Sequence, residues 1–156
     1  MAAPIANTAL LIRRPASEVF RAFADPDVTR RFWFTGSSGP LAPGAEVEWT
    51  WAMYGASTDV KVLAFEPDRR ILISWDNRAT PSEVEWTFEA RGEQTFVTVE
   101  NRGFSSDADG VAKAMDSLNG FSLVLAGAKI WLEHGIEPGF VLDRHPDHRV
   151  AQWRDR

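Results

Sequence analysis

Hydrophobic and polar residues alternate along several segments of the chain, and two of these segments use nearly the same letters. EVEWTWA at 46–52 and EVEWTFE at 83–89 both place valine or an aromatic residue at alternate positions, separated mainly by glutamate and threonine. A period of two is typical of a strand with one buried and one solvated face. Because the similarity stops after seven residues, it favours two strands that face one apolar layer over an internal repeat.

Three further segments alternate in the same way, at 58–65, 70–76 and 94–102. Turn-forming sequences such as YGAS, EPDRR and DNRATPS separate the segments, and gaps this short are typical of antiparallel hairpins. Residues 5–13 read as an additional first strand.

Two short helices are predicted after this first strand. The sequence ASEVFRAFAD at 16–25 spaces its apolar residues as a helix does. Asp25 is a suitable helix cap and Pro26 suits a first helical position, so we expect a second short helix through TRRFWF at 29–34. Residues 35–45 are rich in glycine and proline and predict a loop.

The spacing changes to that of a long helix after residue 109. Its apolar stripe steps by threes and fours, through Ala114, Leu118, Phe121, Leu125, Ala128 and Leu132. Asp107 or Asp109 can cap its start, and Gly135 stands where a helix terminator belongs. Gly120 and Gly127 lie on one face, which permits the close approach of a sheet, a helix or a ligand.

Together these elements predict an α+β protein in which a curved antiparallel sheet of six or seven strands grips a long C-terminal helix. We expect one domain over residues 1–135. We expect the tail, residues 136–156, to pack on the domain or on a partner. A curved sheet cannot press flat on a helix along its whole length, so large side chains fill the gap or a cavity remains.

Composition narrows the functional classes. The chain has 156 residues, a net charge of −5, no cysteine and no basic block, which argues against binding to nucleic acid or to a membrane surface. The N-terminal apolar run lacks a preceding cationic residue, so we read it as a strand rather than a signal peptide. The longest apolar stretch is interrupted by charges and is too short to span a bilayer. We expect a cytoplasmic protein.

Several stretches resemble the START-like, Bet v 1-like superfamily. They are PASEVFRAFADPDVTRRFW, PGAEVEW, VLAFEPDRRILISWD, SEVEWTFEARGEQTFVTVENRGF and GFSLVLAGAKIWLEHG. More narrowly, residues 5–135 are similar to bacterial single-domain proteins related to the C-terminal domain of the heat-shock protein 90 ATPase activator. The family pattern implies a Val-Phe pair at Val19, a tryptophan at Trp33 and another at Trp75. The chain departs from it at Phe121, where relatives commonly have tryptophan.

The resemblance implies a helix-grip fold with a cavity between sheet and helix, which binds a small apolar molecule in many relatives. Some relatives are polyketide cyclase-like enzymes. The chaperone-activating relatives carry an additional N-terminal domain, whereas this chain begins at the first strand, so we do not expect it to activate the chaperone.

Aromatic residues are the main candidates for a binding site, since the chain has seven tryptophans and ten phenylalanines. The inward parity of the strands fits both an aromatic-lined pocket and plain filling of the core. The expected ligand-binding residues are Trp33, Trp49, Trp51, Trp75, Trp86, Phe88, Asn101, Phe121, Leu125 and Ala128.

Few polar residues are candidates for chemistry. Tyr54, Asp76, Arg31 and Asn101 are the best candidates inside a pocket, although Asn101 also reads as a turn residue at a strand end. Strand parity places five acidic residues on the wet face, namely Glu46, Glu48, Glu83, Glu85 and Glu89. RHPDHR at 144–149 superficially suggests metal ligands, but it matches no zinc signature and a solvated tail is favoured. We expect no metal, no cofactor and no identifiable nucleophile.

Three functions follow. The first is binding of a small hydrophobic or aromatic molecule without catalysis. The second is a cyclase or dehydratase that uses the same cavity. The third is a chaperone-related or stress-related interaction module, which includes a possible homodimer.

Overall fold

A computed structural model describes residues 2–147 of the chain. The elements in chain order are β1 (Ala6–Ile12), α1 (Ala16–Ala24), α2 (Pro26–Thr29), β2 (Gly36–Ser37), β3 (Glu46–Trp51), the 3-10 helix η1 (Ala52–Tyr54), β4 (Ala56–Glu66), β5 (Arg70–Trp75), β6 (Ser82–Arg91), β7 (Gln94–Arg102), α3 (Ala108–His134) and α4 (Phe140–Arg144).

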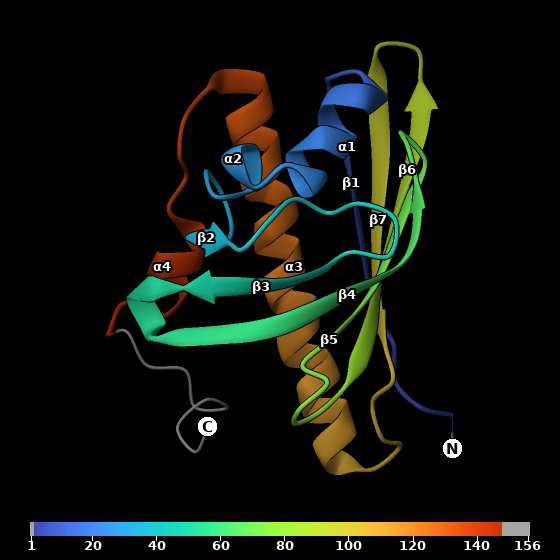
Figure 1. Cartoon of the computed structure of the whole chain (residues 1–156), viewed down its shortest axis with the longest axis vertical. Coiled ribbons are helices and arrows are strands. Elements are labelled where there is room, and N and C mark those ends of the chain that lie inside the picture. The colour runs from blue at the N-terminus through green and yellow to red at the C-terminus, as the bar shows by residue number, and fades with distance from the viewer. Residues whose placement is uncertain (1, 148–156) are drawn as a thin grey trace.

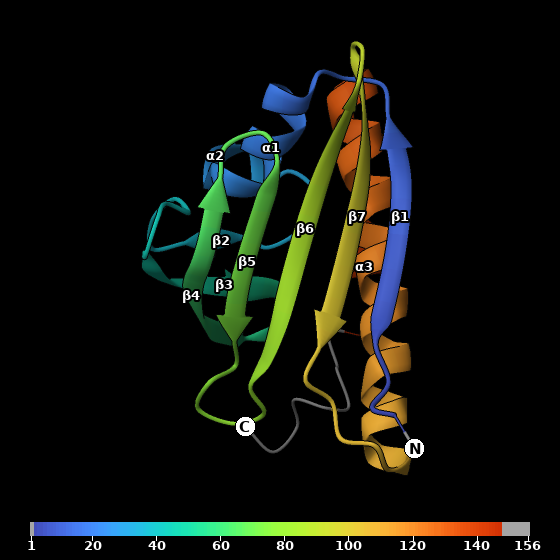
Figure 2. The same ribbon diagram turned by 90° about the vertical axis from the view of Figure 1, so that its right-hand side faces the viewer.

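The strands form one seven-stranded sheet in the order β1-β7-β6-β5-β4-β3-β2, and every neighbouring pair is antiparallel. The sheet bends strongly, so that β3 and β4 run across the direction of β6 and β7 (Figure 1). The helix α3, 27 residues long, lies along the inner side of this curve (Figures 1 and 2). The predicted α+β helix-grip fold is confirmed.

Strand parity explains the core. Eight inward residues of the four central strands are at most 3% exposed, namely Val60, Val62, Ile71, Ile73, Val84, Trp86, Val97 and Val99. The repeated EVEWT stretch behaves as expected, because Trp49 in β3 and Trp86 in β6 are each 1% exposed on the inner face. Two strands thus meet the same packing demand with the same short sequence.

Two local predictions were wrong, both before β3. The second helix ends at Thr29 instead of continuing to residue 34. Phe32, Trp33 and Phe34 are all buried, and a helix cannot turn three consecutive side chains toward one side. The predicted loop 35–45 contains the short strand β2, which pairs with the edge of β3 at Thr50.

The helix α3 has well-defined ends. Asp107, one of the two predicted caps, accepts a hydrogen bond from the Gly110 amide at 2.9 Å. Gly135 ends the helix in the left-handed conformation, with φ of 67°, as predicted. Although α3 is long, none of the helices within residues 2–147 is apolar enough over a sufficient length to cross a membrane.

Candidate ligand-binding site

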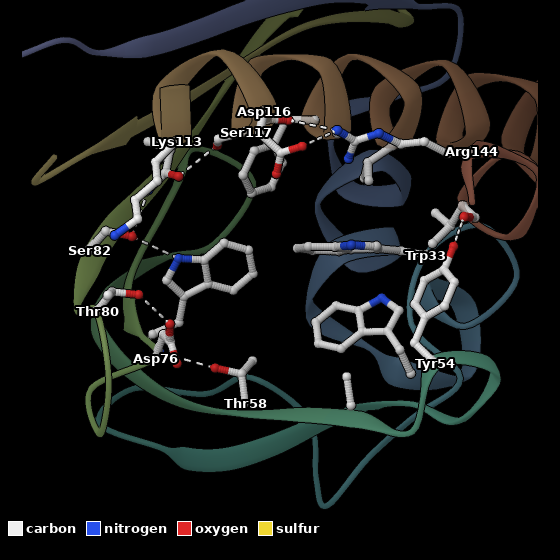
Figure 3. A pocket seen from close by; sticks show the side chains of 18 of the residues that line it. Trp33, Tyr54, Thr58, Asp76, Thr80, Ser82, Lys113, Asp116, Ser117 and Arg144 are labelled. Carbon is white, nitrogen blue, oxygen red and sulfur yellow. Dashed lines mark hydrogen bonds and ion pairs between the residues drawn. The ribbon is translucent and has the colours of Figure 1, made fainter. Parts of the chain in front are cut away.

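A cavity of about 750 Å³ lies between the sheet and α3, mainly along the N-terminal half of the helix and as far as Val124. The ends of β3, β5, β6 and β7 contribute to its lining, and α4 supplies a further wall (Figure 3). This volume falls within the usual range of small-molecule pockets, roughly 300–1,000 Å³.

Aromatic rings form the apolar wall of the cavity. Trp33, Trp51 and Phe121 line it and are 7%, 6% and 5% exposed. The Trp33 ring centroid lies 4.9 Å from that of Trp49, which is behind the lining, and 6.1 Å from that of Trp75, which is in it. The rings thus support one another in edge-on and tilted contacts, a geometry favourable for aromatic pairs.

The structure divides the expected ligand-binding residues into two sets. Five line the cavity: Trp33, Trp51, Trp75, Asn101 and Phe121. The other five do not line it and are at most 4% exposed within the hydrophobic core: Trp49, Trp86, Phe88, Leu125 and Ala128. In the second set, Trp49 and Trp86 contact the lining ring of Trp33 from outside the cavity.

Asn101 joins three elements at one end of the cavity. It lies within β7 rather than in a turn, and it is 2% exposed. Its side-chain nitrogen donates to Ser82 Oγ at 3.0 Å and to the Glu83 carbonyl at 2.7 Å. Its oxygen accepts a hydrogen bond from Ser117 Oγ of α3 at 2.7 Å. Trp75 Nε1 also donates to Ser82 Oγ, at 2.9 Å, so the aromatic wall is tied to this cluster.

Asp76 brings a carboxylate to the cavity from the loop after β5. Its φ of 56° is left-handed, a conformation that aspartate tolerates better than most residues. The Asp76 amide donates to Thr58 Oγ1 at 3.1 Å, and Thr80 donates to the carboxylate at 2.7 Å (Figure 3). The first bond holds the Asp76 backbone, and the second orients its carboxylate.

Tyr54 and His145 meet where α4 closes the cavity. The Tyr54 hydroxyl donates to the Val141 carbonyl, and the Tyr54 and His145 rings are 5.8 Å apart, edge to face. Burial raises the pKa of Tyr54, with an opposing effect from Arg144, so the phenol stays protonated at neutral pH. Burial and the positive charge of Arg144 lower the pKa of His145, which favours the neutral imidazole.

Some sequence candidates lie elsewhere. Arg31 pairs with Glu137 at 2.9 Å and stacks over Trp131, and it is not in the cavity lining. None of the wet-face glutamates lines the cavity. Glu85 contacts Arg70 and Arg102; partial burial raises the pKa of Glu85, but these hydrogen bonds outweigh it and hold the pKa below its usual value.

The sequence did not reveal the contribution of the tail. Val141, Arg144 and His145 line the cavity, although the tail shows no periodicity that would place them there. The one signal was Gly120, which faces Arg144 across a short gap. His148 and the final residues of the tail lie outside the described residues.

The cavity lining combines aromatic rings with several polar groups. Its polar groups are hydroxyls, an amide, carboxylates, a lysine, an arginine and the imidazole of His145, all suited to hydrogen bonding. Over residues 2–147, no group of three or more His, Asp or Glu side chains could hold a metal ion.

A sequence model of the family described as "Activator of Hsp90 ATPase homolog 1-like protein" matches residues 13–122. The chain belongs to this family. The resemblance noted in the sequence is therefore confirmed, and the family and fold are consistent with a ligand-binding domain. No curated protein matched the chain in a sequence search.

Solved structures of several family-like proteins are similar. SSP2350 from Staphylococcus saprophyticus is 25% identical, with a TM-score of 0.76, and the match covers 86% of this chain and 95% of that one. DynU16, from the dynemicin biosynthetic locus, is 23% identical with a TM-score of 0.75, covering 85% of this chain and 48% of that one. The Aha1 dimer from Colwellia psychrerythraea is 19% identical with a TM-score of 0.73, covering 85% and 98%.

Proposed function

We propose that this protein binds a small hydrophobic or aromatic molecule in the cavity between sheet and α3. The observation that carries the proposal is a space of about 750 Å³ whose wall is built from Trp33, Trp51, Trp75 and Phe121. Apolar walls with a few fixed polar groups are the usual composition of small-molecule sites. The similarity to a protein from a biosynthetic locus supports the same reading.

The test is tryptophan fluorescence titration with flavonoids, fatty acids and polyketide-like compounds. We expect saturable quenching by at least one class. Trp75→Ala, in the cavity wall, should weaken that binding roughly tenfold or more, since burial of an aromatic side chain contributes about 1.5–3 kcal/mol. Trp131→Ala is the matched control, because Trp131 is absent from the cavity lining. Equal binding by both variants would refute the proposal.

An enzyme remains a second candidate because Asp76 and Tyr54 both line the cavity. A cyclase or dehydratase could use such groups as general acid and base. Asn101 is less suited, since its amide is already engaged by Ser82, Glu83 and Ser117. Turnover of a cyclisable substrate that Asp76→Asn abolishes, without loss of binding, would favour the enzyme.

A homodimer is a separate proposal. Its support is the dimeric state named for the Colwellia psychrerythraea protein and an exposed apolar stripe on α3, formed by Val111, Met115 and Leu118. Met115 is 67% exposed. Light scattering of the wild type and of Met115→Glu tests it, and a wild-type monomer at high concentration would exclude it. The cytoplasmic location stays a prediction.

A further inference from the structure

We infer that Arg144 is a specificity-determining residue that anchors an acceptor oxygen of the ligand, with a carboxylate as the preferred group. The inference rests on the proposed function and deepens it: the ligand would be an aromatic body that carries an acidic or carbonyl oxygen at one edge. Arg144 lies in α4, outside the family match to residues 13–122. The anchor therefore lies outside the residues that the family model matches.

The first observation is the hydrogen bonding of the guanidinium. Arg144 lines the cavity, and its side chain is only 20% exposed. Its Nη2 donates to Asp116 Oδ1 at 2.5 Å and to the Asp116 carbonyl at 3.2 Å. Within residues 2–147, Asp116 is the one hydrogen-bond partner of this side chain. A guanidinium carries five N–H donors in a planar fork, so Nε and Nη1 retain donor capacity for a ligand.

The second observation is the space that α3 leaves for Arg144. A Cβ atom on Gly120 would lie 2.9 Å from Arg144 Nη1, closer than such atoms normally approach. Glycine is unfavourable inside a helix, and here its missing side chain lets the guanidinium lie against the helix. Asp116 and Gly120, four residues apart on α3, thus hold one group in place, and Figure 3 shows Arg144 beside Asp116 on the cavity wall.

The third observation is that the other cationic residue of the cavity lining, Lys113, is more exposed to solvent than Arg144. Lys113 also lines the cavity but is 40% exposed and pairs with Asp109 at 3.0 Å. Arg144 is the better shielded of the two, and a charge-assisted hydrogen bond is strongest where water is partly excluded. An aromatic acid could therefore place its rings against Trp33 and Phe121 and its oxygen toward Arg144.

A pair of probes separates this anchor from general apolar binding. Isothermal titration calorimetry would compare 2-naphthoate with 2-naphthalenemethanol, which has the same rings and no charge. We expect the wild type to prefer naphthoate by roughly tenfold or more, the size of one charged hydrogen bond. Arg144→Met keeps most of the aliphatic stem and should abolish this preference, while affinity for the alcohol changes far less.

Two further variants distinguish an anchor from a simple latch that fastens the tail. Gly120→Ala should displace Nη1 and weaken naphthoate binding while thermal stability stays equal or rises. Asp116→Asn removes the competing carboxylate and should tighten naphthoate binding. A latch predicts the opposite for Asp116→Asn, with both probes weakened.

Three results of these binding measurements would overturn the anchor. Equal binding of the two probes by the wild type, or equal loss of both in Arg144→Met, would overturn the anchor and leave the cavity as an apolar site. Absence of saturable binding for both probes would overturn the anchor and count against the proposed function as well.

Discussion

The two halves of α3 share one helix and one apolar stripe, yet they meet different surroundings. In the C-terminal half, Leu125 and Ala128 are 1% and 0% exposed and belong to the hydrophobic core. In the N-terminal half, Lys113, Ser117 and Gly120 border the cavity. The position of the cavity is therefore not set by the sequence pattern of the helix itself. It is set by which other elements pack against each half of the helix.

The connection between β1 and β3 packs against the C-terminal half of α3 through Phe32, and its next residue, Trp33, lines the cavity. A Cβ on Gly127 would lie 3.3 Å from Phe32 Cβ, so the segment after α2 presses directly on the C-terminal half of the helix. Phe32 also meets Phe23 of α1, with ring centroids 5.4 Å apart. The N-terminal half faces strand ends and α4 instead, and the cavity lies there.

The largest expected effect comes from paired leucine truncations on α3. Leu125→Ala opens a void in the packed half and should lower the free energy of unfolding by about 2–5 kcal/mol. Leu123→Ala, at a half-buried position in the cavity lining, should lower it by less than about 1 kcal/mol. Urea denaturation followed by circular dichroism measures both. Equal losses would mean that the cavity-lining position and the core position of the helix are packed alike.

A smaller loss of stability is expected from removing the hydrogen bond that joins the N-terminal half of α3 to the sheet. Ser117→Ala leaves the buried Asn101 oxygen without its donor and should lower the free energy of unfolding by about 1–3 kcal/mol. Ser122→Ala is the control, because Ser122 is exposed on the same helix and its hydrogen bond to Thr8 of β1, at 3.1 Å, is open to water. It should stay within about 0.5 kcal/mol of wild type. A neutral Ser117→Ala would show that the tie contributes nothing.

Replacing each of the two glycines of α3 by alanine should change the stability of the protein differently in the two halves. Gly120→Ala meets only the flexible end of Arg144, so it should gain up to about 1 kcal/mol of helix stability. Gly127→Ala meets Pro138 Cγ at 3.2 Å and Phe32 Cβ and carbonyl oxygen at 3.3 and 3.4 Å, so it should gain less or lose stability. Thermal unfolding of both variants tests the order, and a more stable Gly127→Ala would reverse it.

The smallest effect should be a pH dependence from His145. Its pKa in the folded protein is lowered from 6.5, so the unfolded chain binds the proton more readily. This contribution to stability is therefore present above about pH 6.5 and is lost as pH falls through that value toward the lowered pKa. His145→Gln should reduce the drop in melting temperature between about pH 7.5 and about pH 5.5. An unchanged drop would exclude His145 as its source.

The sheet and the long helix could be predicted because their signals are local. Period-two alternation locates the inward side of every central strand, and Asp107 and Gly135 mark the ends of α3. The short elements before β3 could not be predicted in the same way. The burial of Phe32, Trp33 and Phe34 depends on contacts with strands and helices far along the chain.

Half of the expected site residues line the cavity for a related reason. Parity tells which side of a sheet a residue faces, but not how many ring layers lie in front of it. Trp49 and Trp51 share parity on β3, yet only Trp51 lines the cavity, because Trp33 packs in front of Trp49. Arg144 could not be placed at all, since it reaches the site only through the packing of the tail on α3.

The crowding of indoles around Trp33 has an optical consequence. The centroids of Trp49, Trp51, Trp75 and Trp86 lie 4.9, 6.1, 6.1 and 6.0 Å from that of Trp33. At such separations an excited state migrates from one indole to the next before light is emitted. A molecule that touches a single ring would thereby dim the emission of the whole group, and deleting one ring would redistribute the signal rather than remove a fixed share of it.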